Sequence, residues 1–283
     1  MRVLVTGANG FIGTHVVDAA IKLGHEVIAA DFKFDNLPVS ITRCNVPIFE
    51  DDSNIYKALG SPDVCIHLAW RQGFVHNSKA HMQDLSKHAT FLQNMIDGGL
   101  PLLSVMGTMH EIGYWEGKID ENTPCKPMSQ YGIAKNALRE SISLYAKDTN
   151  CVLHWLRAYY ITGDEERTSN IFAKITQAAN NGQSTFPFTS GKNKYDFIDV
   201  DDLAKMIVMA SVQHKINGII NVCSGKPISL AEKVEDFIRT KNYSIRLDYG
   251  AFPDRAYDSP IVYGDNSKIR AIMNGDKSKA SEK

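Results

Sequence analysis

The sequence predicts an α/β fold in which helices cover both faces of a doubly wound parallel sheet, followed by a smaller C-terminal lobe. The first observation is a series of short apolar runs that alternate with helical patterns, the order expected of βαβ units. These runs cover residues 2–6, 25–30, 64–69, 102–106 and 151–157. From about residue 164 polar stretches and turn signals become frequent, which indicates a second lobe of short elements.

The second observation is a glycine-rich turn directly after the first apolar run. Gly7 allows a sharp turn out of the strand, Gly10 lets the main chain approach a pyrophosphate, and Gly13 lets the next helix pack closely on the sheet. Asp31 ends the second run, where a carboxylate can accept hydrogen bonds from ribose hydroxyls. The pattern predicts a Rossmann-type site for a dinucleotide. Its predicted contacts are Gly7, Asn9, Gly10, Phe11, Ile12, Gly13 and Asp31.

The charges at the end of the second run bear on which dinucleotide binds. The Asp31 carboxylate favours NAD, because its charge would repel the 2′-phosphate of NADP. Lys33 follows close behind and keeps NADP open as an alternative.

Helical patterns fill the segments between the apolar runs. One follows Gly10, and a second covers about residues 78–97 and ends at Gly98 and Gly99. A third covers about residues 130–148. Strands that alternate with such helices indicate a parallel sheet.

The chain divides into two lobes and a tail. We assign residues 1–163 to the dinucleotide-binding domain and expect residues 199–222 to return to it. Residues 164–198 and 223–273 are expected to form the substrate-binding lobe. The Lys/Ser-rich tail, residues 274–283, is expected to be poorly ordered.

Composition excludes several classes of partner. The net charge of −1 gives no reason to expect nucleic acid or an anionic membrane surface. No apolar stretch approaches the roughly 18 residues that span a bilayer, and the first residues already belong to a core strand rather than a targeting segment. The five cysteines are widely spaced without a C-x-x-C pair, so we expect reduced thiols, no metal site and a cytoplasmic protein.

Tyr131 and Lys135 stand one turn apart on a predicted helix. A phenol with a pKa near 10 is a poor base at neutral pH, but a lysine ammonium beside it lowers that pKa. Tyr131 is therefore expected to exchange a proton with a sugar or alcohol oxygen, and Lys135 is expected to bind a ribose as well.

Together these motifs resemble the extended short-chain dehydrogenase/reductase family, in its branch of nucleotide-sugar epimerases, dehydratases and reductases. The resemblance covers most of the chain, and its motifs lie at residues 7–13, 67–70, 107–113, 157–164, 191–202 and 221–225. Residues 157–164 lack the asparagine and both prolines of the family pattern, and three single positions also depart from it. Trp70 replaces a small residue, Ile112 replaces a tyrosine, and Tyr195 replaces an arginine.

The resemblance implies a role for individual residues. Thr108, Tyr131 and Lys135 would be catalytic, and Leu68 and Ala69 would join Tyr131 and Lys135 in binding the cofactor. The substrate contacts implied are Trp70, Thr108, His110, Tyr159, Tyr160, Lys192 and Arg255, of which Arg255 would bind the substrate diphosphate. The resemblance also implies a homodimer that pairs the helices near 78–97 and 130–148.

Plainer roles compete at several of these positions. The Thr108 hydroxyl could cap a turn at the end of its strand, and His67 is expected to pack beside the cofactor rather than transfer protons. His110 and Glu111 would either face substrate or lie in a solvated turn. The three aspartates at 199, 201 and 202 are expected to start a helix rather than bind a metal.

Three reactions use this set of residues, and they are distinguished only in part by the sequence. A dehydratase of the family needs an acid–base pair after the threonine, where this chain has Met109 and His110, so dehydration is disfavoured. We favour reduction of a 4-keto (6-deoxy) nucleotide sugar, with 4-epimerisation by tightly bound NAD as the alternative. A non-catalytic NAD-sensing protein is a remoter alternative, because such proteins commonly lack the tyrosine or the lysine. The nucleotide and the sugar are not identified.

Overall fold

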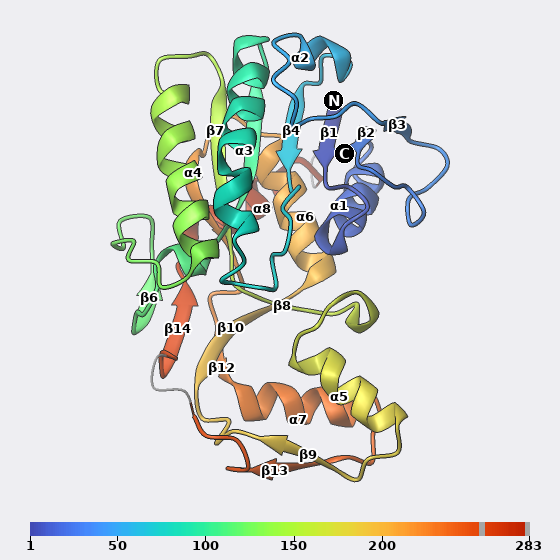
Figure 1. Cartoon of the computed structure of the whole chain (residues 1–283), viewed down its shortest axis with the longest axis vertical. Coiled ribbons are helices and arrows are strands. Elements are labelled where there is room, and N and C mark those ends of the chain that lie inside the picture. Colours follow the sequence, from blue (N-terminus) through green and yellow to red (C-terminus); the bar gives the residue numbers. More distant parts are fainter. Residues whose placement is uncertain (255–257, 281–283) are drawn as a thin grey trace.

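The computed structural model describes residues 1–254 and 258–280, with side chains up to residue 275 (Figure 1). Its main layer is a seven-stranded sheet with the order β11-β7-β5-β4-β1-β2-β3, and every neighbouring pair is parallel. The strands are β1 (Arg2–Thr6), β2 (Glu26–Ala30), β3 (Thr42–Cys44), β4 (Val64–His67), β5 (Leu102–Thr108), β7 (Val152–Ala158) and β11 (Gly218–Val222). The five predicted runs are all strands of this sheet, which confirms the predicted fold class.

The strand order reverses between β1 and β4, which makes this point the switch point of the sheet. Ligands of open α/β sheets bind in the crevice at the carboxyl ends of the strands beside such a point. Gly7 follows β1 and Leu68 follows β4, so both predicted cofactor segments lie at this crevice.

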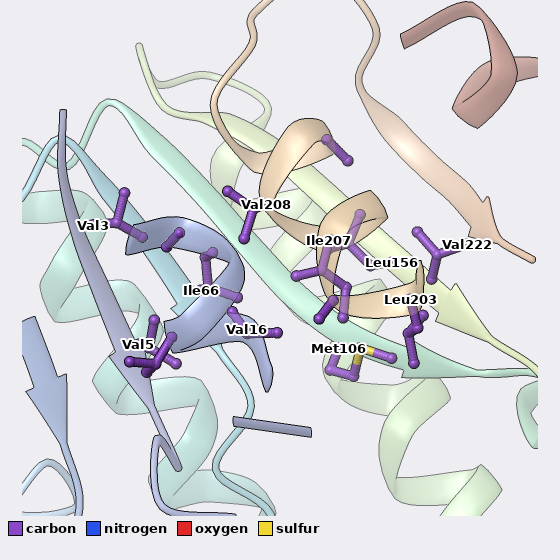
Figure 2. Close-up of a cluster of buried hydrophobic side chains, with 14 of the residues drawn as sticks. Val3, Val5, Val16, Ile66, Met106, Leu156, Leu203, Ile207, Val208 and Val222 are labelled. Carbon is purple, nitrogen blue, oxygen red and sulfur yellow. The ribbon is translucent and has the colours of Figure 1, made fainter. Parts of the chain in front are cut away.

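Helices cover both faces of the sheet, and successive residues of β1 point to opposite sides. Val3 and Val5 belong to one core with α1 (Phe11–Lys22), α6 (Val200–Ser211) and α8 (Ser267–Ala280). Figure 2 shows part of this core, with Val16 of α1 and Leu203, Ile207 and Val208 of α6. Leu4 packs on the other side, against α2 (Ile55–Ala58), α3 (Ala80–Asp97) and α4 (Gln130–Ala146). This alternation is what a strand buried on both faces requires.

The second lobe lies at the lower end of the long axis in Figure 1. A five-stranded sheet joins it to the first layer through β8 (Tyr160–Thr162), β10 (Lys194–Asp199), β12 (Pro227–Ser229), β14 (Ile261–Gly264) and β6 (Gly117–Ile119). Beyond it lie α5 (Ile171–Asn180), α7 (Leu230–Thr240) and the strand pair β9 (Thr185–Phe188) and β13 (Arg246–Tyr249). These elements share a third apolar core.

Two segments differ from the expected division of the chain. β6 pairs with β14 in the second sheet, although residues 117–119 precede the expected boundary at residue 163. Ile269 and Ile272 of α8 are buried in the core of the first sheet, so this part of 223–273 returns to the first lobe.

The last described element is helix α8, Ser267–Ala280, whose bounds include the first part of the C-terminal tail. Ile269 and Ile272 anchor its first turns in the core of the first sheet. Residues 281–283 lie outside the described residues. None of the described helices is both long and apolar enough to span a bilayer.

Candidate active site

The glycine-rich turn forms a cradle that leaves no room for side chains. Gly7 has φ of 67°, and a Cβ on Gly13 would lie 2.1 Å from the Gly7 carbonyl oxygen. Leu68 and Ala69 lie against this turn. A Cβ on Gly7 would be only 2.7 Å from the Ala69 nitrogen. The backbone of β1 and that of β4 therefore close around one narrow crevice.

The start of α1 lacks the side-chain cap that α4, α5, α6 and α7 have. Ser129, Asn170, Asp199 and Ser229 accept backbone hydrogen bonds at the starts of α4, α5, α6 and α7. Gly10 at the start of α1 has no side chain to do so, and the first turn of α1 holds no acidic residue. Its free N–H groups and the positive end of the helix dipole suit the pyrophosphate of a dinucleotide.

Asp31 fits the ribose of the same ligand. Its carboxylate accepts hydrogen bonds from the backbone N–H of Asn9 at 2.9 Å and of Phe32 at 2.7 Å, so it faces the glycine turn. A cavity of about 700 Å³ opens beyond it and is lined by Phe32, Lys33, Phe34, Asp35, Leu37, Val39 and Arg43. A carboxylate next to this cavity in the sequence suits an adenosine without a 2′-phosphate.

The structure brings Thr108 and Tyr131 together across two elements. Thr108 ends β5, and Tyr131 lies in the first turn of α4, which is capped by Ser129. The two side chains form a hydrogen bond. The Thr108 hydroxyl also accepts a hydrogen bond from His110 N–H at 3.3 Å, so the turn-capping role and the proposed catalytic position coincide.

The electrostatics of Tyr131 differ from the expectation. Burial raises the pKa of Tyr131 well above its usual range, the nearby Glu111 charge raises it further, and the hydrogen bond with Thr108 opposes them. We expected Lys135 to lower this pKa. That expectation is wrong for the protein without cofactor, because the phenolate would have to form in a buried site close to a carboxylate.

Lys135 lies one turn further along α4 and is itself buried. Its Nζ donates a hydrogen bond of 2.7 Å to the carbonyl oxygen of Met106 and lies 3.8 Å from the centre of the Trp70 ring. Burial lowers the pKa of Lys135 to about 7, against an upward effect of Glu111. The ammonium is therefore held by a carbonyl and an aromatic face.

Glu111 is neither a substrate contact nor a solvated turn residue. Its side chain is fully buried, accepts a hydrogen bond of 2.7 Å from the Thr108 backbone N–H, and pairs with Arg157 at 3.3 Å. The Trp155 indole donates to it at 3.0 Å. Because it binds the backbone of Thr108 directly, this network fixes the end of β5.

The expected substrate contact His110 lies beside Tyr131, together with His76 and His81, which the sequence analysis missed. The rings of these three histidines lie 5.3–6.1 Å from the Tyr131 ring, and the His76 carbonyl accepts the Tyr131 N–H at 2.8 Å. Arg167, from the polar stretch after residue 164, donates to the Asn9 carbonyl at 2.5 Å and to Thr14 Oγ1 at 2.7 Å. The density of histidines between 67 and 110 is a signal that could have found His76 and His81.

The expected substrate contacts are spread over several environments. Tyr159 is buried and donates from its hydroxyl to Asn221 at 3.2 Å, whereas Tyr160 lies partly exposed with its ring 4.3 Å from that of Tyr195. Lys192 is exposed on a loop. Arg255 lies outside the described residues.

The aspartates after β10 have the role expected of them. Asp199 caps α6 by accepting the Asp201 N–H at 2.9 Å, and Asp201 and Asp202 lie in the first turn of that helix.

Comparisons with known proteins find relatives along nearly the whole chain. At 42% identity over 93% of this chain and 99% of the relative, the chain is similar to the dTDP-6-deoxy-L-talose 4-dehydrogenase (NAD(+)) of Aggregatibacter actinomycetemcomitans. It is 26% identical to the putative UDP-glucose 4-epimerase of Methanocaldococcus jannaschii, over 91% of this chain and 86% of the relative.

Solved structures show the same fold. A Thermotoga maritima UDP-glucose 4-epimerase with UDP-glucose superposes with a TM-score of 0.81 at 23% identity, covering 96% of this chain and 92% of that one. The Thermus thermophilus UDP-glucose 4-epimerase complex with NAD has a TM-score of 0.78 at 21% identity, over 96% and 92% of the two chains.

The family comparison confirms the resemblance drawn from the motifs. Residues 3–223 match the family described as the NAD dependent epimerase/dehydratase family, a span from β1 to the end of the parallel sheet. The glycine cradle, Asp31 and the Thr108–Tyr131–Lys135 group all fall inside it. The chain belongs to the NAD dependent epimerase/dehydratase family.

Proposed function

We propose that this protein is an NAD-dependent oxidoreductase that interconverts the 4-hydroxyl and 4-keto forms of a nucleotide-linked 6-deoxyhexose. The observation that carries the proposal is the 42% identity, over nearly the whole of both chains, to a dTDP-6-deoxy-L-talose 4-dehydrogenase. The proposed substrate class is therefore a dTDP-6-deoxy sugar.

The proposed mechanism assigns one task to each of three side chains. In the direction of reduction, Tyr131 donates its hydroxyl proton to the C4 carbonyl oxygen as C4 accepts a hydride, and Thr108 donates a second hydrogen bond to the same oxygen. NADH, when bound, supplies that hydride. The carbonyl becomes an alcohol, and Tyr131 is left deprotonated.

The surroundings of Tyr131 favour the return of its proton. Burial and the Glu111 charge both raise the pKa of Tyr131, so the phenolate is a strong base in this site. In the reverse direction the same phenolate would accept the proton of the 4-hydroxyl. Lys135 would bind the nicotinamide ribose with the N–H groups that Met106 does not use.

We also propose a cytoplasmic homodimer formed through α3 and α4. These helices pack side by side on one face of the sheet in Figure 1. They leave apolar side chains exposed at Met82, Ile133 and Leu144, the last of them 74% exposed. Light scattering after gel filtration tests this: Leu144→Lys should shift a dimer to monomer, and a monomeric wild type would contradict the proposal.

Product analysis tests the proposed reaction. The purified protein is incubated with a panel of dTDP-, UDP-, GDP- and CDP-linked 6-deoxy sugars and their 4-keto forms, with NAD⁺ or NADH, and the products are identified by NMR. We expect a 4-keto product and one NADH per sugar with a dTDP-6-deoxy sugar and NAD⁺. Inversion at C4 without net NADH would instead establish an epimerase.

A further inference from the structure

Lys135 is a buried cation without the usual partner of a buried cation. Only 2% of the residue is exposed, yet in the part of the chain that the structure describes it forms no ion pair with a carboxylate. The contacts of its Nζ are the Met106 carbonyl at 2.7 Å and the Trp70 ring, whose centre is 3.8 Å away. An ammonium in a dry site needs compensation, so the indole face is a major part of its environment.

An aromatic face compensates this charge in a way that a carboxylate does not. The π-face of tryptophan attracts a cation, most strongly where both are out of water, but it takes up no N–H donor. A carboxylate in the same place would accept one or two of the three ammonium hydrogens. Here one hydrogen is used by Met106, and the remaining donors stay available to a ligand.

The indole of Trp70 is held in place on two sides by α3. Its ring stacks on His88 with centres 4.5 Å apart and planes 19° apart. Its Nε1 donates to His81 Nδ1 at 3.1 Å, which leaves the other His81 nitrogen to donate to the Val75 carbonyl at 2.9 Å. A stacked face and a directed hydrogen bond together fix the ring orientation.

A chain of hydrogen bonds connects this ring to the cofactor strand. The Thr6 hydroxyl accepts the Ala69 N–H, so it can donate its own hydrogen to His67 Nδ1 at 2.8 Å. His67 Nε2 then donates to His88 Nδ1 at 2.9 Å. Burial lowers the pKa of both imidazoles, that of His88 to about 3, so neither adds a positive charge beside Lys135. Thr6 immediately precedes Gly7.

We propose that Trp70 is a positioning residue: its indole, held by His81 and His88, sets the Lys135 ammonium with free N–H donors toward the cofactor ribose. The inference rests on the proposed role of Lys135 in binding the cofactor.

A double-mutant cycle measured by titration calorimetry tests the proposal. NAD⁺ is titrated into cofactor-free wild type and into W70L, K135M and the double variant W70L/K135M. We expect W70L and K135M each to weaken NAD⁺ binding about tenfold, and W70L to add less than about twofold once Lys135 is absent. W70F keeps an aromatic face and should stay within about threefold of wild type.

The other outcomes separate the inference from the function on which it rests. Equal losses from W70L with and without Lys135, or W70F as weak as W70L, would show that Trp70 acts only through packing and overturn the inference alone. Wild-type affinity in K135M would overturn the role of Lys135 and the inference with it. The matched control is W115L, since Trp115 is a partly buried tryptophan whose Nε1 donates to the Lys118 carbonyl in the second sheet, and it should bind NAD⁺ as wild type does.

Discussion

Glu111 and Lys135 are both buried charges close to β5, yet their surroundings differ. Glu111 accepts hydrogen bonds from the Thr108 backbone, Trp155 and Arg157. Lys135 has one carbonyl and the face of an indole. The first charge is fully compensated by the fold, whereas the second retains donors that the fold does not use.

The difference separates two uses of a buried charge. A charge with a complete set of partners orients its neighbours, here the backbone of Thr108, and costs a great deal when one partner is removed. A charge with an incomplete set of hydrogen-bond partners lowers the stability of the ligand-free protein, but its unused donors can bind a ligand. The following variants test this division, beginning with the largest effect.

Tyr131 lies close to both charges, since Glu111 raises its pKa and Lys135 follows one turn later on α4. Tyr131→Phe removes the hydroxyl and its proton but keeps the ring, so turnover should fall by about 10²–10⁴-fold. NAD⁺ binding measured by calorimetry should remain within a few-fold of wild type. Retained turnover in the spectrophotometric NADH assay would contradict the catalytic role.

Removing the compensated charge of Glu111 should destabilise the folded protein. Glu111→Gln leaves Arg157 buried without its ionic partner, and we expect a loss of about 3 kcal/mol in the free energy of unfolding, measured in urea. Glu140→Gln is the control, because Glu140 pairs with Arg139 at the surface and should change stability by less than about 0.5 kcal/mol. Equal effects of the two variants would show that Glu111 has no special structural role.

Removing the uncompensated charge of Lys135 should change the free energy of unfolding in the opposite direction. Lys135→Met places an apolar side chain in a buried site and should raise the free energy of unfolding by about 1 kcal/mol at pH 7, with loss of activity. The surface variant Lys147→Met should leave stability nearly unchanged. A destabilised Lys135→Met protein would mean that the fold needs this ammonium.

The pH dependence of that gain follows from the pKa of Lys135. Burial lowers this pKa to about 7 in the folded protein, whereas an unfolded lysine has a pKa near 10.4. Between these values the unfolded chain binds more protons, so the stability of the wild type rises with pH. The advantage of Lys135→Met should therefore be largest below pH 7 and fade toward pH 10, as urea titrations across this range would show.

The last variant concerns the choice of cofactor. Asp31→Ala removes the carboxylate that faces the glycine turn, so the preference for NAD over NADP should fall by about tenfold in steady-state kcat/KM. An unchanged preference would place the discrimination elsewhere, with Lys33 and Arg43 of the neighbouring cavity as the residues to vary next.

Local signals predicted the first lobe well because each one has a local cause. The apolar runs became strands, and the glycine turn and Asp31 lie at the switch point. Long-range contacts were missed. β6 joins the second sheet only because β14 returns beside it, and α8 docks on the first sheet through Ile269 and Ile272.

The candidate site shows the same limit. Spacing alone brought Tyr131 and Lys135 onto one helix, but it did not reveal that Lys135 faces Trp70 or that Glu111 is buried against Arg157. Burial set the pKa values of Tyr131 and Lys135, and burial depends on the whole fold rather than on the i and i+4 positions.

The central claim is that this site carries out net oxidation or reduction at C4 of a nucleotide-linked 6-deoxy sugar. The most direct measurement follows deuterium from a dTDP-6-deoxy sugar labelled at C4, with NAD⁺ in excess. The account predicts that the label leaves the sugar and appears in NADH released into solution, as mass spectrometry would detect. Label retained at C4 of a sugar with inverted configuration would contradict the claim and identify an epimerase.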